Sequence, residues 1–150
     1  MRALRRAALS AATCESLTGG LVGATLTSVP GASTVYRGGL VTYASDLKAS
    51  LAGVDADWIA SHGVINATTA AQMALGCARA CGADVGMSCT GVAGPDPQDG
   101  FGAGTVYVAV SVRGEVTVRD LALAGDRQSI RRQTVDALLA LVLEVLGVEA

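Results

Sequence analysis

Short apolar segments rich in β-branched residues alternate along the chain with segments whose apolar residues repeat at helical period. The last segment is typical of an amphipathic helix, because apolar residues recur about every 3.6 positions from Ile130 to Leu146. Strands are predicted at residues 8–15, 39–43, 85–90, 105–112 and 115–123. Helices are predicted at residues 20–28, 45–51, 55–61, 67–80 and 126–146. Strands that alternate with helices in this way indicate an α/β fold.

Residues that can cap a helix stand at the start of each predicted helix. They are Thr18, Ser45, Asp55, Asn66 and Asp126. The dipeptide Arg113–Gly114 separates the last two predicted strands and predicts a hairpin. Because a hairpin makes that strand pair antiparallel, we expect a mixed sheet with helices on both faces, a three-layer α/β/α architecture.

The 150 residues contain no internal repeat, low-complexity tract or dividing linker, so we expect one domain over residues 1–150. Polar loops leave the carboxyl ends of the predicted strands at Ser16, Tyr43 and Thr90. Ligands of open α/β sheets bind at this edge, so these three residues are expected to converge.

Composition narrows the classes of function. Hydrophobic residues make up 51% of the chain and aromatic residues only 3%, so the core is expected to consist of Ala, Val, Leu and Ile. A formal net charge of −2 argues against direct nucleic-acid binding, which usually needs a basic face. Every apolar run is interrupted well before the roughly 20 residues of a membrane span. The Arg-rich start is followed by too short an apolar stretch for a secretory signal.

The four cysteines, Cys14, Cys77, Cys81 and Cys89, match no zinc-binding spacing, and His62 is the one histidine. We therefore expect neither a metal nor another cofactor. Cys77 and Cys81 lie four positions apart and share a helix face. We interpret them as small buried residues of a protein in the reducing cytoplasm rather than as a ligand pair.

Lysine usage points to one position. The 11 basic residues comprise ten arginines and a single lysine, Lys48. A guanidinium stays protonated near neutral pH, whereas an ammonium in a desolvated pocket can lose its proton. Lys48 thus marks a place where a titratable amine is needed, unless its isolation is accidental.

Two segments could supply a nucleophile and a base. In CESLTGG, Cys14 to Gly20, Ser16 follows a strand, and the amides at the helix start could hold an anion. The alternative is that Ser16 and Thr18 only cap the helix. In VTYASDLK, Val41 to Lys48, the amine could act as a general base to a serine. The alternative there is an exposed, solvated lysine.

Two further segments could bind an anion. CTGVAGPD, Cys89 to Asp96, is a Gly-rich turn after a strand, although it lacks the ending of a P-loop. The alternative is a flexible turn without a ligand. In GDRQSIRRQT, Arg127, Arg131 and Arg132 cluster at a helix start, where cations oppose the helix dipole unless an anion docks there. Arg127 and Arg131 share a face, and the alternative is ordinary surface charge.

Seven segments in one order carry a resemblance that covers about residues 8–147. They are CESLTGG, VPGAS, GGLVTYASDLK, SHGVI, CTGVAGPD, GAGTVYVA and GDRQSIRRQT. Together they resemble the CinA C-terminal domain family, whose enzymatic members are nicotinamide-nucleotide amidases. The resemblance implies a three-layer α/β domain that hydrolyses nicotinamide mononucleotide to the acid and ammonia, with no metal.

The same resemblance implies roles for individual residues. Ser16 and Lys48 match a catalytic pair, and Tyr43 and Thr90 match polar positions around it. Lys48 or Tyr43 would protonate the leaving ammonia, and backbone amides around Gly19 and Gly20 would stabilise the oxyanion. Positions assigned to substrate binding, above all the ribose phosphate, are Thr18, Gly19, Gly20, Gly91, Gly94, Thr105 and Arg127.

The chain also departs from the family pattern. Relatives usually have a helix before the first strand, and we expect that helix to be largely absent here. Leu17 and Ala103 replace a usual cysteine and valine. Longer relatives carry an additional N-terminal domain, for which we expect no room.

Two alternatives to this function stay open. The chain could be a catalytically silent nucleotide-sensing or partner module linked to competence and DNA repair, or an amidase acting on another small amide. The expected partners are a small-molecule nucleotide and further copies of this chain.

Overall fold

A computed structural model describes residues 1–148 as one α/β domain built on a five-stranded sheet. The strands are β1 (Ala11–Glu15), β2 (Tyr36–Val41), β3 (Val85–Gly91), β4 (Thr105–Val112) and β5 (Glu115–Ala122). Their order in the sheet is β2-β1-β3-β4-β5. Strand β1 pairs in parallel with β2 and β3, whereas β3–β4 and β4–β5 are antiparallel. The mixed sheet and the hairpin at Arg113–Gly114 are therefore confirmed.

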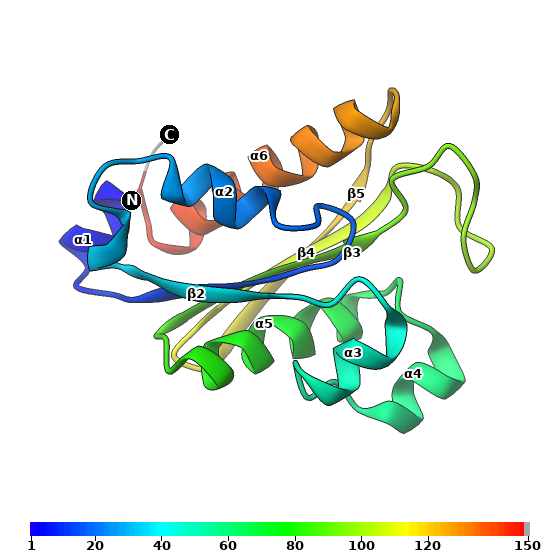
Figure 1. Ribbon diagram of the computed structural model, residues 1–150, viewed down its shortest axis with the longest axis horizontal. Helices are drawn as coiled ribbons and strands as arrows, with labels where there is room; N and C mark the ends of the chain where they lie inside the picture. Colours follow the sequence, from blue (N-terminus) through cyan, green and yellow to red (C-terminus); the bar gives the residue numbers. More distant parts are fainter. Residues whose placement is uncertain (149–150) are drawn as a thin grey trace.

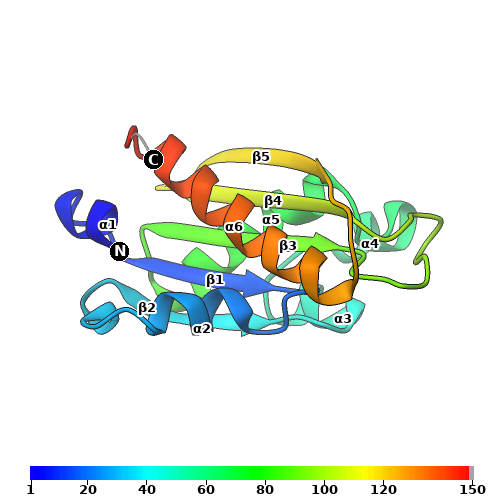
Figure 2. The same cartoon turned by 90° about the horizontal axis from the view of Figure 1, so that it is seen from above.

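Helices cover both faces of the sheet, which confirms the three-layer α/β/α architecture (Figure 1). On one face α2 (Leu21–Thr27) packs over β1 and β2, and α6 (Arg127–Val145) packs over β3 and β4 (Figure 2). The opposite face is covered by α5 (Ala67–Cys81), with α3 (Ser45–Ser50) and α4 (Ala56–His62) beside it. The remaining helical elements are α1 (Arg2–Arg6) and a short 3₁₀ turn, η1 (Ala32–Thr34).

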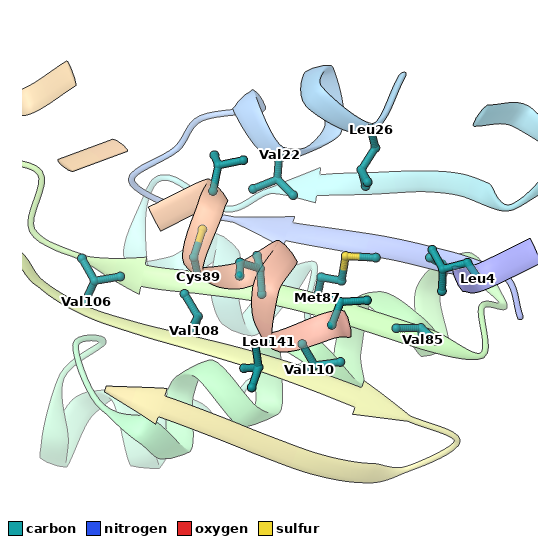
Figure 3. Packing of buried hydrophobic residues seen from close by; sticks show 14 of the residues in the cluster. Leu4, Val22, Leu26, Val85, Met87, Cys89, Val106, Val108, Val110 and Leu141 are labelled. Carbon is teal, nitrogen blue, oxygen red and sulfur yellow. The ribbon is translucent and has the colours of Figure 1, made fainter. Parts of the chain in front are cut away.

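Small aliphatic side chains form the core, as the composition predicts. Strand β4 shows how alternation divides them: Val106, Val108 and Val110 face α6 (Figure 3), whereas Ala109 packs against Ala70 on α5. Every residue of β1 is buried, because helices cover both of its faces. Within residues 1–148, no helix combines the length and the apolar character needed to cross a bilayer.

The N-terminal boundary differs from the prediction. The first strand begins at Ala11 rather than at residue 8, and a helix precedes it at Arg2–Arg6. Ala8 adopts a left-handed conformation with φ 53°, which ends this helix, and the Leu9 amide donates back to the Leu4 carbonyl. The expectation that this helix would be largely absent is therefore corrected. Strand β2 likewise starts earlier than predicted, because Gly38 and Gly39 conceal its alternation.

Three of the predicted caps are confirmed, since Asp55, Asn66 and Asp126 each accept backbone N–H groups of the next turn. Two are wrong. Ser45 is the first residue of α3 and follows its cap Ala44. Thr18 lies before the cap of α2, because a carboxylate from the preceding strand already occupies the start of that helix.

The topology brings six chain segments to one edge of the sheet. Because β1, β2 and β3 are parallel, their carboxyl ends lie at the same edge. The antiparallel strand β4 begins there, β5 ends there, and α6 starts directly after β5. Any polar side chains placed at these strand ends are therefore brought together.

Candidate active site

A cavity of about 460 Å³ opens at this edge of the sheet. Seven of the residues predicted from the sequence line it: Ser16, Tyr43, Lys48, Thr90, Gly91, Gly94 and Arg127. They come from the ends of β1, β2 and β3 and the turns that follow them, from the last turn of α3 and from the start of α6. The expected convergence of Ser16, Tyr43 and Thr90 is thus observed.

Ser16 and Lys48 form the centre of this site. Lys48 Nζ lies 3.1 Å from Ser16 Oγ and donates to the Thr42 carbonyl at 2.7 Å. The Ser16 amide donates to the Cys89 carbonyl, which fixes the serine beside β3. Lys48 is only 1% exposed, so the alternative of a solvated surface lysine is wrong.

Burial lowers the pKa of the Lys48 amine. Neither salt bridge found within residues 1–148 involves Lys48. Burial also raises the pKa of the neighbouring Cys14 thiol to about 11 and that of Cys89 to about 12. These thiols stay neutral near pH 7, so no residue in the described part of the chain serves as an anionic partner that would hold the proton of the amine.

Thr90, Tyr43 and Arg127 shape the walls of the cavity. Thr90 Oγ1 donates to the Val64 carbonyl at 2.8 Å and so ties β3 to the segment between α4 and α5. Arg127 bridges the two rims, donating to the Gly94 carbonyl at 2.6 Å and to Tyr43 Oη at 2.9 Å. Arg127 is therefore part of the site rather than ordinary surface charge.

Four of the predicted substrate-binding residues do not line the cavity: Thr18, Gly19, Gly20 and Thr105. The Gly19 amide donates to the Ser16 carbonyl at 3.0 Å, and the Gly20 amide donates to Glu15 Oε2 at 3.0 Å. Of the amides around Gly19 and Gly20 that were expected to stabilise an oxyanion, these two therefore already have intramolecular acceptors. Thr105 is the first residue of β4, and its carbonyl accepts from the Val92 amide.

Glu15 is the residue that the sequence interpretation missed. It is 2% exposed, and its carboxylate accepts from Thr18 Oγ1 and from the amides of Gly20, Val22 and Gly23. A carboxylate at the end of a fully buried strand, followed by two glycines, was a signal that could have revealed this role. Since residues alternate along β1, Glu15 faces α2 while Cys14 faces the side of Lys48.

Glu15→Gln is expected to lower the free energy of unfolding by about 2–3 kcal/mol, because an amide nitrogen replaces one acceptor among four donors. Urea denaturation at pH 7 measures this loss. The control is Glu115→Gln, an exposed carboxylate at the start of β5. Equal stability of the two variants would contradict the role of Glu15.

The sequence interpretation also left the apolar wall unassigned. Val64, Ile65 and Val92 are buried, pack together and line the cavity. The SHGVI segment contains two of them, so its place in the family pattern reflects this wall. A flat apolar ring could pack here beside the polar groups of Ser16 and Lys48.

All four cysteines carry free thiols. Cys77 is buried as expected, and so are Cys14 and Cys89, whereas Cys81, also expected to be buried, is half-buried at the end of α5. Within the part of the chain that the structure describes, no three His, Cys, Asp or Glu side chains are grouped closely enough to hold a metal ion.

Sequence and structure comparisons agree on one family. The profile described as CinA C-terminal domain matches residues 1–146. A "CinA-like protein" of Frankia casuarinae is 43% identical over 91% of this chain and 31% of that protein. A "Putative competence-damage inducible protein" of Limosilactobacillus fermentum is 45% identical over 95% of this chain and 35% of that protein. The chain therefore spans about a third of the length of these curated relatives.

Solved structures extend the match to three dimensions. A CinA superfamily protein from Klebsiella pneumoniae has a TM-score of 0.94 at 31% identity, covering 97% of this chain and 92% of that one. The competence/damage inducible protein CihA from Agrobacterium tumefaciens has a TM-score of 0.90 at 32% identity, covering 96% of this chain and 88% of that one. The chain belongs to the CinA C-terminal domain family.

Proposed function

We propose that this chain is an amidohydrolase that converts nicotinamide mononucleotide to nicotinic acid mononucleotide and ammonia. The observation that carries the proposal is the buried amine of Lys48, 3.1 Å from the hydroxyl of Ser16 at the wall of a ligand-sized cavity. An amine that loses its proton at this distance is a general base for the serine.

The reaction begins with proton transfer. Neutral Lys48 Nζ takes the proton of the Ser16 hydroxyl, and Oγ forms a bond to the carboxamide carbon of the substrate. The tetrahedral intermediate collapses when the carbon–nitrogen bond breaks and Lys48 returns the proton to the leaving nitrogen, which departs as ammonia. The short distance from Lys48 to Ser16 favours Lys48 over Tyr43 for this step, since Lys48 is the group that contacts the nucleophile.

Water completes the cycle. It loses a proton to Lys48 and attacks the acyl carbon, the ester bond to Ser16 breaks, and the serine regains its proton from Lys48. The product leaves as the acid. Each step uses a single base that alternates between its neutral and protonated forms, which requires a pKa nearer to neutrality than that of a solvated lysine.

The cavity fits a pyridine nucleotide in size and charge. Its volume of about 460 Å³ lies in the range of roughly 300–1,000 Å³ typical of small-molecule sites. The apolar wall of Val64, Ile65 and Val92 offers a surface for the ring. The Arg127 guanidinium at the rim, beside the Gly91 to Gly94 turn, supplies positive charge for a phosphate.

The substrate assists its own reaction. The cationic ring withdraws electrons from the amide carbon, which favours attack by Ser16. Its positive charge also favours the neutral form of Lys48 by like-charge repulsion. Free nicotinamide lacks both the ring charge and the phosphate, so it is expected to react far more slowly.

Ammonia release from nicotinamide mononucleotide, with chromatographic detection of the acid product, tests the proposal. The substrate panel also contains free nicotinamide and the dinucleotides. Turnover of the mononucleotide supports the proposal, whereas turnover of another amide alone indicates an amidase of different specificity. An absence of turnover with every substrate would favour a catalytically silent nucleotide-sensing or partner module. Its link would then be to competence, the term in the names of relatives.

Two further parts of the proposal concern the setting of the protein. Its free thiols suit the reducing cytoplasm. Association into a homo-oligomer stays a prediction, which sedimentation velocity of the purified chain tests.

A further inference from the structure

We propose that Arg131 is a positioning residue, which orients the loop of residues 16–20 so that the Leu17 amide can stabilise the oxyanion formed at Ser16. This inference rests on the proposed amidohydrolase function and replaces the role first expected for Gly19 and Gly20. The negative charge that develops on the substrate oxygen is then stabilised by a different amide of the same loop, that of Leu17.

Arg131 holds the loop by its backbone. Its Nε donates to the Leu17 carbonyl at 3.1 Å, and Nη2 donates to the Thr18 carbonyl at 2.8 Å. The third contact, from Nη1 to Gln128 at 2.8 Å, lies within α6 and fixes the guanidinium on its own helix. Arg131 thus connects the first turns of α6 to a loop 113 residues away in the chain.

Three other amides of the loop are fixed as well. The Ser16 amide donates to the Cys89 carbonyl, and the Gly19 amide donates back to the Ser16 carbonyl. Glu15 holds the Gly20 amide from the side of α2. The cation of Arg131 and the anion of Glu15 therefore immobilise the loop through different backbone groups.

Two amides that follow the nucleophile, those of Leu17 and Thr18, have no protein acceptor among residues 1–148. Of these two residues, Leu17 lines the cavity and Thr18 does not. Leu17 lines the cavity and its side chain belongs to the hydrophobic core, from which we infer that its backbone N–H faces the cavity. The amide that follows a nucleophilic serine is well placed to meet the oxyanion, because both atoms lie on one turn of chain.

The Thr18 carbonyl that Arg131 holds shares its peptide plane with the Gly19 amide, and that amide holds the Ser16 carbonyl. The Ser16 carbonyl shares its peptide plane with the Leu17 N–H, so Arg131 restrains this N–H through two linked peptide planes. Each peptide unit is planar, so a loop whose carbonyls are held in place has few remaining ways to turn its N–H groups. An oxyanion donor is effective when it is oriented before the reaction, and small displacements near a nucleophile reduce rates by about 10²-fold. Arg131 therefore acts on the rate through the loop and not through the substrate.

The neighbouring arginine provides a matched control. Arg132 has the same charge and the next position on α6, but it is exposed, and no hydrogen bond is found for its side chain within the described part of the chain. The variants compared are Arg131→Gln, Arg131→Lys and Arg132→Gln. Thermal unfolding followed by circular dichroism checks that each is folded.

The first readout is turnover of nicotinamide mononucleotide. Arg131→Gln is expected to lower kcat about 10- to 100-fold, with KM changed less than about threefold. The pH midpoint of kcat stays at the wild-type value, because the surroundings of Lys48 are intact. The kcat of Arg131→Lys is expected to lie between those of the wild type and Arg131→Gln, since one ammonium cannot reproduce the hydrogen bonds of the guanidinium to two carbonyls. Arg132→Gln stays within about twofold of wild type.

The second readout does not depend on the nucleotide. In the reaction with a fluorophosphonate probe, Ser16 Oγ bonds to phosphorus, fluoride leaves, and the serine proton passes to Lys48. Arg131→Gln is expected to slow this labelling by a factor similar to its loss of kcat. If the wild-type chain labels but releases no ammonia from the nucleotide, the proposed substrate is wrong while the labelling series still tests Arg131.

Labelling of Arg131→Gln at the wild-type rate would overturn the inference, and so would an equal loss of kcat in Arg132→Gln. A change in Arg131→Gln that is confined to KM, or a shifted pH midpoint of its kcat, would also overturn it. If Arg131→Gln does not fold, Arg131→Lys decides: full reactivity overturns the inference, and reduced reactivity with an unchanged pH midpoint supports it. A wild-type chain that neither labels nor turns over substrate overturns both this inference and the proposed function.

Discussion

Ser16→Ala is expected to lower kcat for nicotinamide mononucleotide by about 10³-fold or more, because the covalent route disappears with the hydroxyl. The side chain is 8% exposed, so removing one oxygen leaves the packing of the site intact. KM should change less than about threefold, since the phosphate and ring contacts remain. Steady-state ammonia release at saturating substrate measures the effect.

The matched control for this variant is Ser50→Ala. Ser50 ends α3, is exposed and lies outside the cavity. It should retain wild-type turnover. Ser16→Ala with more than about a tenth of wild-type kcat would contradict covalent catalysis by this residue.

The second large effect is expected at Lys48. Lys48→Arg should lower kcat to about one thousandth of the wild-type value, because a guanidinium does not give up its proton near neutral pH. Lys48→Met keeps a similar length without charge and should lose activity equally. In the wild type, kcat/KM should rise with pH through the lowered pKa of Lys48, as the amine becomes neutral.

Although Lys48→Met should lose activity, its free energy of unfolding should increase. Between the lowered pKa of the folded chain and the ordinary value of 10.5, unfolding takes up a proton at Lys48. The free energy of unfolding of the wild type therefore increases with pH over this window, and this lysine destabilises the fold most at low pH. Lys48→Met is expected to be more stable than wild type at pH 7, with the difference narrowing toward pH 10.

Urea denaturation at pH 7 and at pH 9.5 compares the two chains. Groups that titrate in both chains cancel in the difference. A Lys48→Met variant less stable than wild type at pH 7 would contradict an amine that is buried without an anionic partner. Gain of stability together with loss of activity would identify Lys48 as a group retained for chemistry.

The sequence predicted the site better than it predicted the surroundings of the site. Ser16, Tyr43 and Thr90 follow strands, and parallel strands end at one edge, so their convergence could be predicted without coordinates. Lys48 could be selected because every other basic residue is an arginine. Its distance to Ser16 could not be predicted, because it depends on how α3 turns after β2.

The roles of Glu15 and Arg131 needed the structure because both act on backbone groups. Backbone amides and carbonyls leave no trace in the side-chain pattern, and Arg131 acts on residues 113 positions away. The interpretation of the helix start as an anion site was physically reasonable, but the chain supplies its own anion there. Likewise, the left-handed turn at Ala8 has no sequence signal, since glycine usually occupies such positions.

The proton affinity of Lys48 tests the central claim most directly. Because the chain contains one lysine, selective ¹³C labelling of lysine gives a single side-chain Cε resonance, whose pH titration reports this amine alone. The same titration of the chain unfolded in urea provides the reference. We predict a midpoint in the folded chain well below 10.5, the ordinary value for lysine, and a normal midpoint in the unfolded chain. A folded midpoint at or above the unfolded one would contradict the account.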